Sequence, residues 1–204
     1  MATQAIAQDK LAEEDVLRAD MYAFLASLFR KEPSDELIQS VAALEGDKTP
    51  IGSACSTLAR LAGSMDNELI RNEYVSVFIG VGRGEVLPFA SYYLIGFLND
   101  RPLANLRKNM AEMGIERVQN VKEPEDHISS VFDIMVGMIR GDFGRYFTLA
   151  EQAQFYRKHI ETWAGMLMSD IEVAKTAVFF APVGTIGKLF IEIESQAFSM
   201  DSSG

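Results

Sequence analysis

The segment Glu123-Pro124-Glu125-Asp126-His127 gathers three carboxylates and one imidazole within five residues. Pro124 is predicted to open a helix, which would put this set in its first turn. Glu123 and His127 lie four residues apart, so they could share one helix face. Acidic residues there complement the helix dipole by about 0.3–1 kcal/mol each. The other interpretation is a binding site, because a carboxylate in a groove can take the planar fork of a partner's arginine.

Adjacent acid and imidazole groups could also perform general acid–base catalysis, so a hydrolase that uses His127 with Asp126 or Glu123 is an alternative. The sequence contains no Gly-x-Ser-x-Gly elbow, no Glu-x-x-His pair, and only one histidine besides His127. Its single cysteine, Cys55, rules out a cysteine-based zinc finger. We therefore expect no catalytic residues, no metal and no cofactor.

The overall charge favours a cationic partner. Lys and Arg together number 19 and Asp and Glu 29, which gives a net charge of −10. Such a surface should repel nucleic acid and anionic membranes. No run of about 18 apolar residues occurs, so we expect no stable membrane insertion. Residues 1–15 show no basic region followed by an apolar run, and one cysteine allows no internal disulfide, so we expect a cytoplasmic protein.

Apolar residues at helical spacing predict a first helix around residues 17–29, which ends near Glu32-Pro33. Further helix starts are indicated by capping residues. These are Ser34, Thr49 before Pro50, Asp66, and Thr148 with Glu151 three residues later. Another helix is predicted over 103–113, closed by Gly114, and a long one from Pro124. Because these helices are joined by short loops, the pattern predicts an all-α fold.

Residues 74–79 are rich in β-forming side chains, but no second convincing strand could pair with them, so we predict a helix there. A glycine-rich loop over 80–84, a short helix over about 91–98 and a polar loop over 118–122 should follow. A last helical stretch over about 170–198 should be interrupted at Pro182. The prediction is one globular helical bundle of about 9–11 helices over 1–204, with 1–10 and 199–204 as flexible tails.

Three blocks of the sequence resemble the TorD/DmsD family of redox-enzyme maturation proteins. They are Arg18-x-x-x-Tyr22-x-x-Leu25-x-x-Leu28-Phe29, then Glu73-Tyr74-x-x-Val77-Phe78-Ile79-Gly80 with Pro88-x-x-Ser91-x-Tyr93, and Glu123-Pro124-Glu125-Asp126-His127. The third block is similar to the family's Glu-Pro-x-Asp-His signature and is the most specific. His159 and Trp163 also match a His-x-x-x-Trp pattern of the family.

The resemblance implies a cytoplasmic chaperone rather than an enzyme. Such a protein would bind the twin-arginine signal peptide and the apo form of a molybdoenzyme precursor, assist cofactor insertion and prevent premature export. We expect a monomer or a homodimer. The remaining alternative is a helical interaction or scaffold protein without a signal-peptide client. The residues expected to bind the signal peptide are Tyr74, Phe78, Pro88, Ser91, Tyr93, Glu123, Asp126 and His127.

Overall fold

The computed structural model describes residues 11–116 and 123–201 of the chain, and these residues form ten α-helices without any strand. The predicted polar loop over 118–122 lies outside the described residues. The helices are α1 Glu13–Arg30, α2 Asp35–Ala42, α3 Pro50–Ser64, α4 Asn67–Tyr74, α5 Ala90–Ile95, α6 Arg101–Glu112, α7 Ile128–Arg140, α8 Leu149–His159, α9 Ala164–Glu172 and α10 Phe180–Asp201. The prediction of an all-helical bundle of this size is confirmed.

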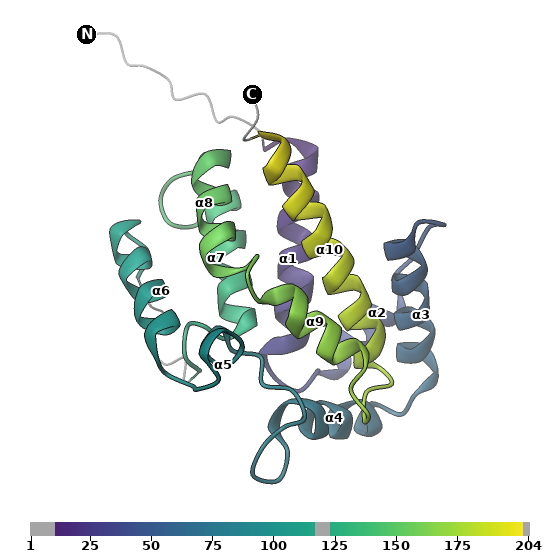
Figure 1. The fold of residues 1–204 in the computed structure, drawn as a ribbon. Helices are drawn as coiled ribbons and strands as arrows, with labels where there is room; N and C mark the ends of the chain where they lie inside the picture. Colours follow the sequence, from purple (N-terminus) through teal and green to yellow (C-terminus); the bar gives the residue numbers. More distant parts are fainter. Residues whose placement is uncertain (1–10, 117–122, 202–204) are drawn as a thin grey trace, which may run out of the picture.

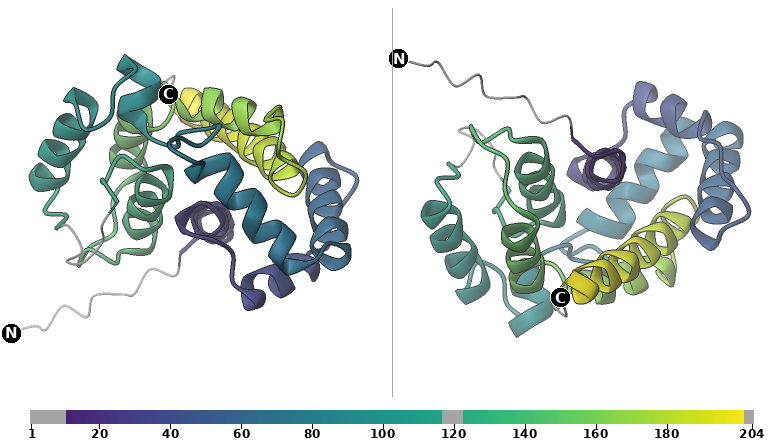
Figure 2. Two further views of the ribbon diagram at one scale, coloured as in Figure 1. Left: turned by 90° about the horizontal axis from the view of Figure 1, so that it is seen from below. Right: turned by 90° about the horizontal axis from the view of Figure 1, so that it is seen from above.

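Helix α1 lies at the middle of the molecule, as the end-on views of Figure 2 show. It packs against α7 on one side and α10 on the other, while α9 and α3 lie against α10 (Figure 1). Helices α2 to α4 cover one end of this arrangement, and α5 and α6 flank α7 at the opposite side (Figures 1 and 2). Helix α1 is therefore the central element between α7 and α10.

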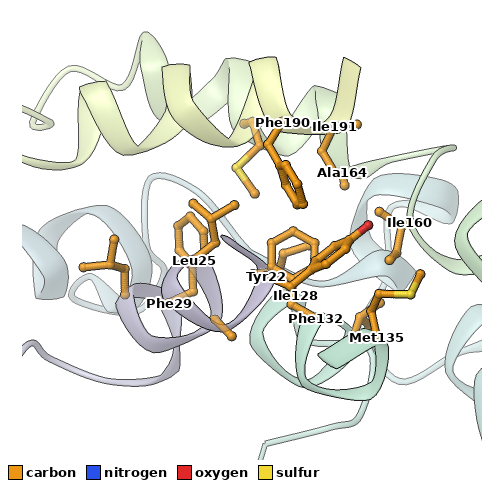
Figure 3. Close-up of a cluster of buried hydrophobic side chains, with 14 of the residues drawn as sticks. Tyr22, Leu25, Phe29, Ile128, Phe132, Met135, Ile160, Ala164, Phe190 and Ile191 are labelled. Atoms are coloured by element: carbon orange, nitrogen blue, oxygen red, sulfur yellow. The ribbon is translucent and has the colours of Figure 1, made fainter. Parts of the chain in front are cut away.

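The core between α1, α7 and α10 combines aromatic and aliphatic side chains (Figure 3). The Tyr22 ring meets the edges of Phe132 at 5.2 Å and Phe190 at 4.7 Å between ring centroids. Its hydroxyl donates to the Glu194 carboxylate at 2.9 Å, and Arg18 donates to the same carboxylate at 2.8 and 3.0 Å. Because Glu194 is 1% exposed, the hydrogen bonds from Tyr22 and Arg18 satisfy a buried carboxylate and connect α1 to α10.

The capping residues act as predicted. Ser34, Thr49 and Asp66 each accept a hydrogen bond from the first turn of the helix that follows, and Thr148 with Glu151 forms a reciprocal capping box. The last helical stretch breaks earlier than expected, over residues 173–179, and Pro182 sits in the first turn of α10. Helix α10 then runs to Asp201, so residues 199–201 are helical.

Residues 74–79 are helical, but with an unusual winding. Helix α4 continues directly into a π-helix, η1 Val75–Ile79, and its last turn is closed when Gly80 N donates to Val75 O at 2.7 Å. Gly80 has a φ of +64°, and an added Cβ there would come within 1.9 Å of the Arg83 carbonyl oxygen. This π-turn is the element that places Phe78 and Ile79, and π-turns often mark functional sites.

Candidate functional site

The segment Glu123–His127 is not the first turn of a helix, so that expectation was wrong. Helix α7 begins at Ile128, and His127 is its N-cap. The reason is a pairing between distant segments: Ala90 N donates to Asp126 O at 2.9 Å, and Ile128 N donates to Pro88 O at 2.9 Å. These bonds flank an isolated antiparallel bridge between Phe89 and His127, which keeps the backbone of His127 extended, so the helix cannot begin before Ile128.

We call this pairing of residues 88–90 with residues 126–128 the brace, and the imidazole of His127 belongs to it. Its Nδ1 accepts from Ser129 N at 3.2 Å and lies 2.8 Å from Ser129 Oγ, which caps α7. Its ring packs edge-on against Phe89, with 5.0 Å between ring centroids. Burial lowers the pKa of His127 to about 4. The ring is therefore neutral near pH 7, with its proton on Nε2, because Nδ1 accepts a backbone hydrogen bond.

The carboxylate of Asp126 points to a different partner. Its Oδ2 accepts from Ser91 N at 2.9 Å and from Ser91 Oγ, while Oδ1 is buried without a hydrogen-bond partner. Asp126 is 1% exposed and Ser91 is fully buried. The two side chains fasten the start of α5 to the start of α7. Asp126 and His127 thus serve separate contacts and do not hydrogen-bond to each other.

Five of the eight residues expected to bind a signal peptide line one cleft of about 230 Å³. They are Tyr74, Phe78, Pro88, Glu123 and His127. Phe89 and Ile79 join them, together with the end of α1 and the two residues after it, Arg30, Lys31 and Glu32. We call this hollow the aromatic cleft. It lies where η1, the segment 88–89 and the approach to α7 meet.

The floor of the aromatic cleft is apolar and its rim is charged. Tyr74 and Phe78 are 5% and 8% exposed, and their rings lie 5.1 Å apart. The Tyr74 hydroxyl donates to Phe29 O at 3.0 Å, and burial raises its pKa, with the carboxylates of Glu123 and Glu32 adding to the rise. Glu123 is exposed at the rim. Such a hollow can accept an apolar segment flanked by charge.

The other three expected residues lie elsewhere. Ser91 and Asp126 are buried beneath the brace, and Asp126 reaches a separate cavity beside His159 and Trp163. The Tyr93 hydroxyl donates to Asp170 on α9 at 2.7 Å, and its ring packs against Trp163. The structure therefore does not bring these three residues to the aromatic cleft.

Sequence reasoning missed Arg30, Lys31 and Glu32 as lining residues. They follow the first predicted helix, and no local signal shows that this helix end meets residues 74–89 in space. Within residues 11–116 and 123–201, no group of three or more His, Cys, Asp or Glu side chains is arranged to hold a metal ion. In the same residues, no helix is both long and apolar enough to span a bilayer.

Residues 44–169 match the profile of a family described as the nitrate reductase delta subunit. The chain is 31% identical to the chaperone protein TorD of Vibrio parahaemolyticus over 60% of this chain and 64% of that protein. It is 27% identical to TorD of Vibrio atlanticus over 88% and 93% of the two chains.

The fold is similar to the crystal structure of a candidate redox enzyme maturation protein from Archaeoglobus fulgidus. The TM-score is 0.60 at 18% identity, over 93% of this chain and 99% of the other. The curated relatives are chaperones, which are not catalytic, so the hydrolase alternative is set aside. The chain belongs to the TorD/DmsD family of redox-enzyme maturation chaperones.

Proposed function

We propose that this maturation chaperone works in the cytoplasm and binds the twin-arginine signal peptide of a molybdoenzyme precursor in the aromatic cleft. By holding the peptide and the apo form of the client, it would allow cofactor insertion before export. The observation that carries the proposal is the cleft itself, in which buried aromatic rings and exposed carboxylates lie side by side.

The cleft fits a segment in which basic and apolar residues are adjacent. Ile79, which is 53% exposed, and the half-buried Phe89 offer apolar surface, and its burial favours an apolar stretch by about 25 cal/mol for each Å² removed from water. Tyr74, Phe78 and Pro88 form the buried floor behind them. Glu32 and Glu123 at the rim offer charge to a neighbouring cation. The net charge of −10 adds a long-range attraction that speeds the encounter with a basic peptide.

Ile79 provides a clean test, because its side chain lines the cleft and is 53% exposed. Ile79→Ser should remove apolar contact with the peptide without disturbing the core. Half of a buried isoleucine corresponds to about 1 kcal/mol, or roughly fivefold in Kd. Val81 is the matched control: it is fully exposed, lies two residues further on and does not line the cleft.

The measurement is calorimetric titration of the full chain with a twin-arginine signal peptide. Ile79→Ser should weaken binding about fivefold, and Val81→Ser should leave the Kd unchanged. If no peptide of this class binds, or if both variants behave alike, the proposal fails. Capture of binding partners from native cytoplasm then distinguishes the proposed chaperone from a scaffold protein without a signal-peptide client. The scaffold alternative predicts partners other than molybdoenzyme precursors.

A further inference from the structure

A second hollow of about 260 Å³ adjoins the aromatic cleft, between α6 and α7. Its apolar floor comes from Met110, Ile115, Ile134 and Phe143. The Phe143 ring lies close against α7, since a Cβ added to Gly137 would come within 2.5 Å of it. We call this hollow the acidic groove, because its lining carries the carboxylates of Glu116, Glu123, Glu125, Asp133 and Asp142.

The described lining of the acidic groove holds five carboxylates against one guanidinium, that of Arg30. Glu125 is buried, and its Oε2 forms an ion pair with Nη2 of Arg107, which lies outside the groove lining, at 2.8 Å. Burial raises the pKa of Asp133, although Arg30 opposes the rise. Among the described residues, the groove therefore combines an apolar floor with more carboxylates than cations, which suits a cation on an aliphatic stem.

Arg30 shows how a guanidinium fits this groove. It donates to both carboxylate oxygens of Asp133, at 2.6 and 2.7 Å, and both side chains are about half exposed. Both contacts come from a single guanidinium nitrogen, Nη2, so this is a charge-assisted pairing that a cation entering the groove could also make with Asp133. Arg30 and Glu123 line the acidic groove and the aromatic cleft alike, so the two hollows adjoin at these residues.

We infer that the acidic groove takes the paired arginines of the client's signal peptide, while the aromatic cleft takes the apolar stretch that follows them. This inference rests on the proposed function and adds a direction to it. The bound peptide crosses from groove to cleft beside Glu123 and Arg30, and one of its arginines competes with Arg30 for the Asp133 carboxylate.

A double-mutant cycle between protein and peptide tests the assignment. The groove variant is Glu116→Gln with Asp142→Asn, two exposed rim residues. The matched control is Glu161→Gln with Glu192→Gln, which removes the same charge from exposed positions outside both hollows. Each protein is titrated with a peptide that carries Arg-Arg and with one that carries Gln-Gln in its place.

The groove variant should bind the Arg-Arg peptide roughly two- to fivefold more weakly for each charge removed. It should bind the Gln-Gln peptide as the unaltered protein does, and raised salt should shrink the difference. If the Arg-Arg peptide binds the unaltered protein but the groove and control variants lose affinity equally, this inference is overturned while the proposed function stands. If neither peptide binds the unaltered protein, the proposed function is wrong and the inference falls with it.

Discussion

Replacing Asp126 by alanine should destabilise the fold, because this carboxylate braces α5 against α7. The substitution removes two hydrogen bonds from Ser91 to a charged acceptor, each worth about 1.5–3 kcal/mol, and leaves the Ser91 N–H buried without a partner. The substitution also removes a buried carboxylate whose Oδ1 has no hydrogen-bond partner, and this gain offsets about 1–3 kcal/mol of the lost stability. The net loss in free energy of unfolding is about 2–3 kcal/mol.

That loss corresponds to a Tm lower by roughly 4–12 °C for a chain of this length. Urea denaturation followed by far-UV circular dichroism measures it. Fluorescence of Trp163 gives a second probe, because it is the single tryptophan and is fully buried. Asp126→Asn should recover most of the stability, since the amide oxygen can still accept from Ser91. Glu192→Ala, at an exposed site on α10 outside both hollows, is the control and should change little.

One result would refute this reasoning. The free energy of unfolding of Asp126→Ala could lie within about 0.5 kcal/mol of that of the unaltered protein while the variant no longer binds the signal peptide. In that case Asp126 contacts the client, and its bonds to Ser91 contribute little to stability. The sequence alone favoured that outcome. The structure favours the opposite, in which weaker binding by Asp126→Ala follows from a loosened cleft.

Three further outcomes are expected. Burial lowers the pKa of both histidines to about 4, so the unfolded chain binds more protons than the folded chain between pH 4 and 6.5. The free energy of unfolding should therefore fall as the pH drops from 6.5 to 4, by up to about 3 kcal/mol for each histidine. Urea midpoints of His127→Gln and of the unaltered protein, measured against pH, test this. Gly84→Ala should destabilise η1, because the new Cβ would come within 2.4 Å of the Phe78 backbone; the urea midpoint should fall, and an unchanged midpoint would mean that the loop adjusts. Arg30→Gln should bind the Arg-Arg peptide more tightly in calorimetry, because Asp133 loses its internal partner, and weaker binding would contradict the competition.

The parts of the fold that sequence reasoning predicted correctly depend on neighbours along the chain. Ser34, Thr49 and Asp66 cap helices through residues two or three positions ahead, so their role is visible in a short window. Residues 74–79 could be assigned as helical because the rest of the sequence offered no partner strand. The π-winding itself could not be read, since it depends on how the chain turns at Gly80.

The error at Pro124 has a non-local cause. A proline followed by acidic residues is a common helix start, but His127 is held extended by its bridge to Phe89 and by the hydrogen bonds on either side of that bridge. Histidine is also an unusual N-cap, so His127 gave no local warning. The acidic groove was missed for the same reason, because its carboxylates gather only when α6 packs near α7.

The central claim is that a twin-arginine signal peptide lies in the aromatic cleft and the acidic groove. Hydrogen–deuterium exchange of the full chain, with and without saturating peptide, tests it most directly. We expect added protection in residues 74–89 and 123–134, with residues 35–64 unchanged. Saturating binding that protects residues 35–64 instead, or that leaves both predicted segments unprotected, would contradict it.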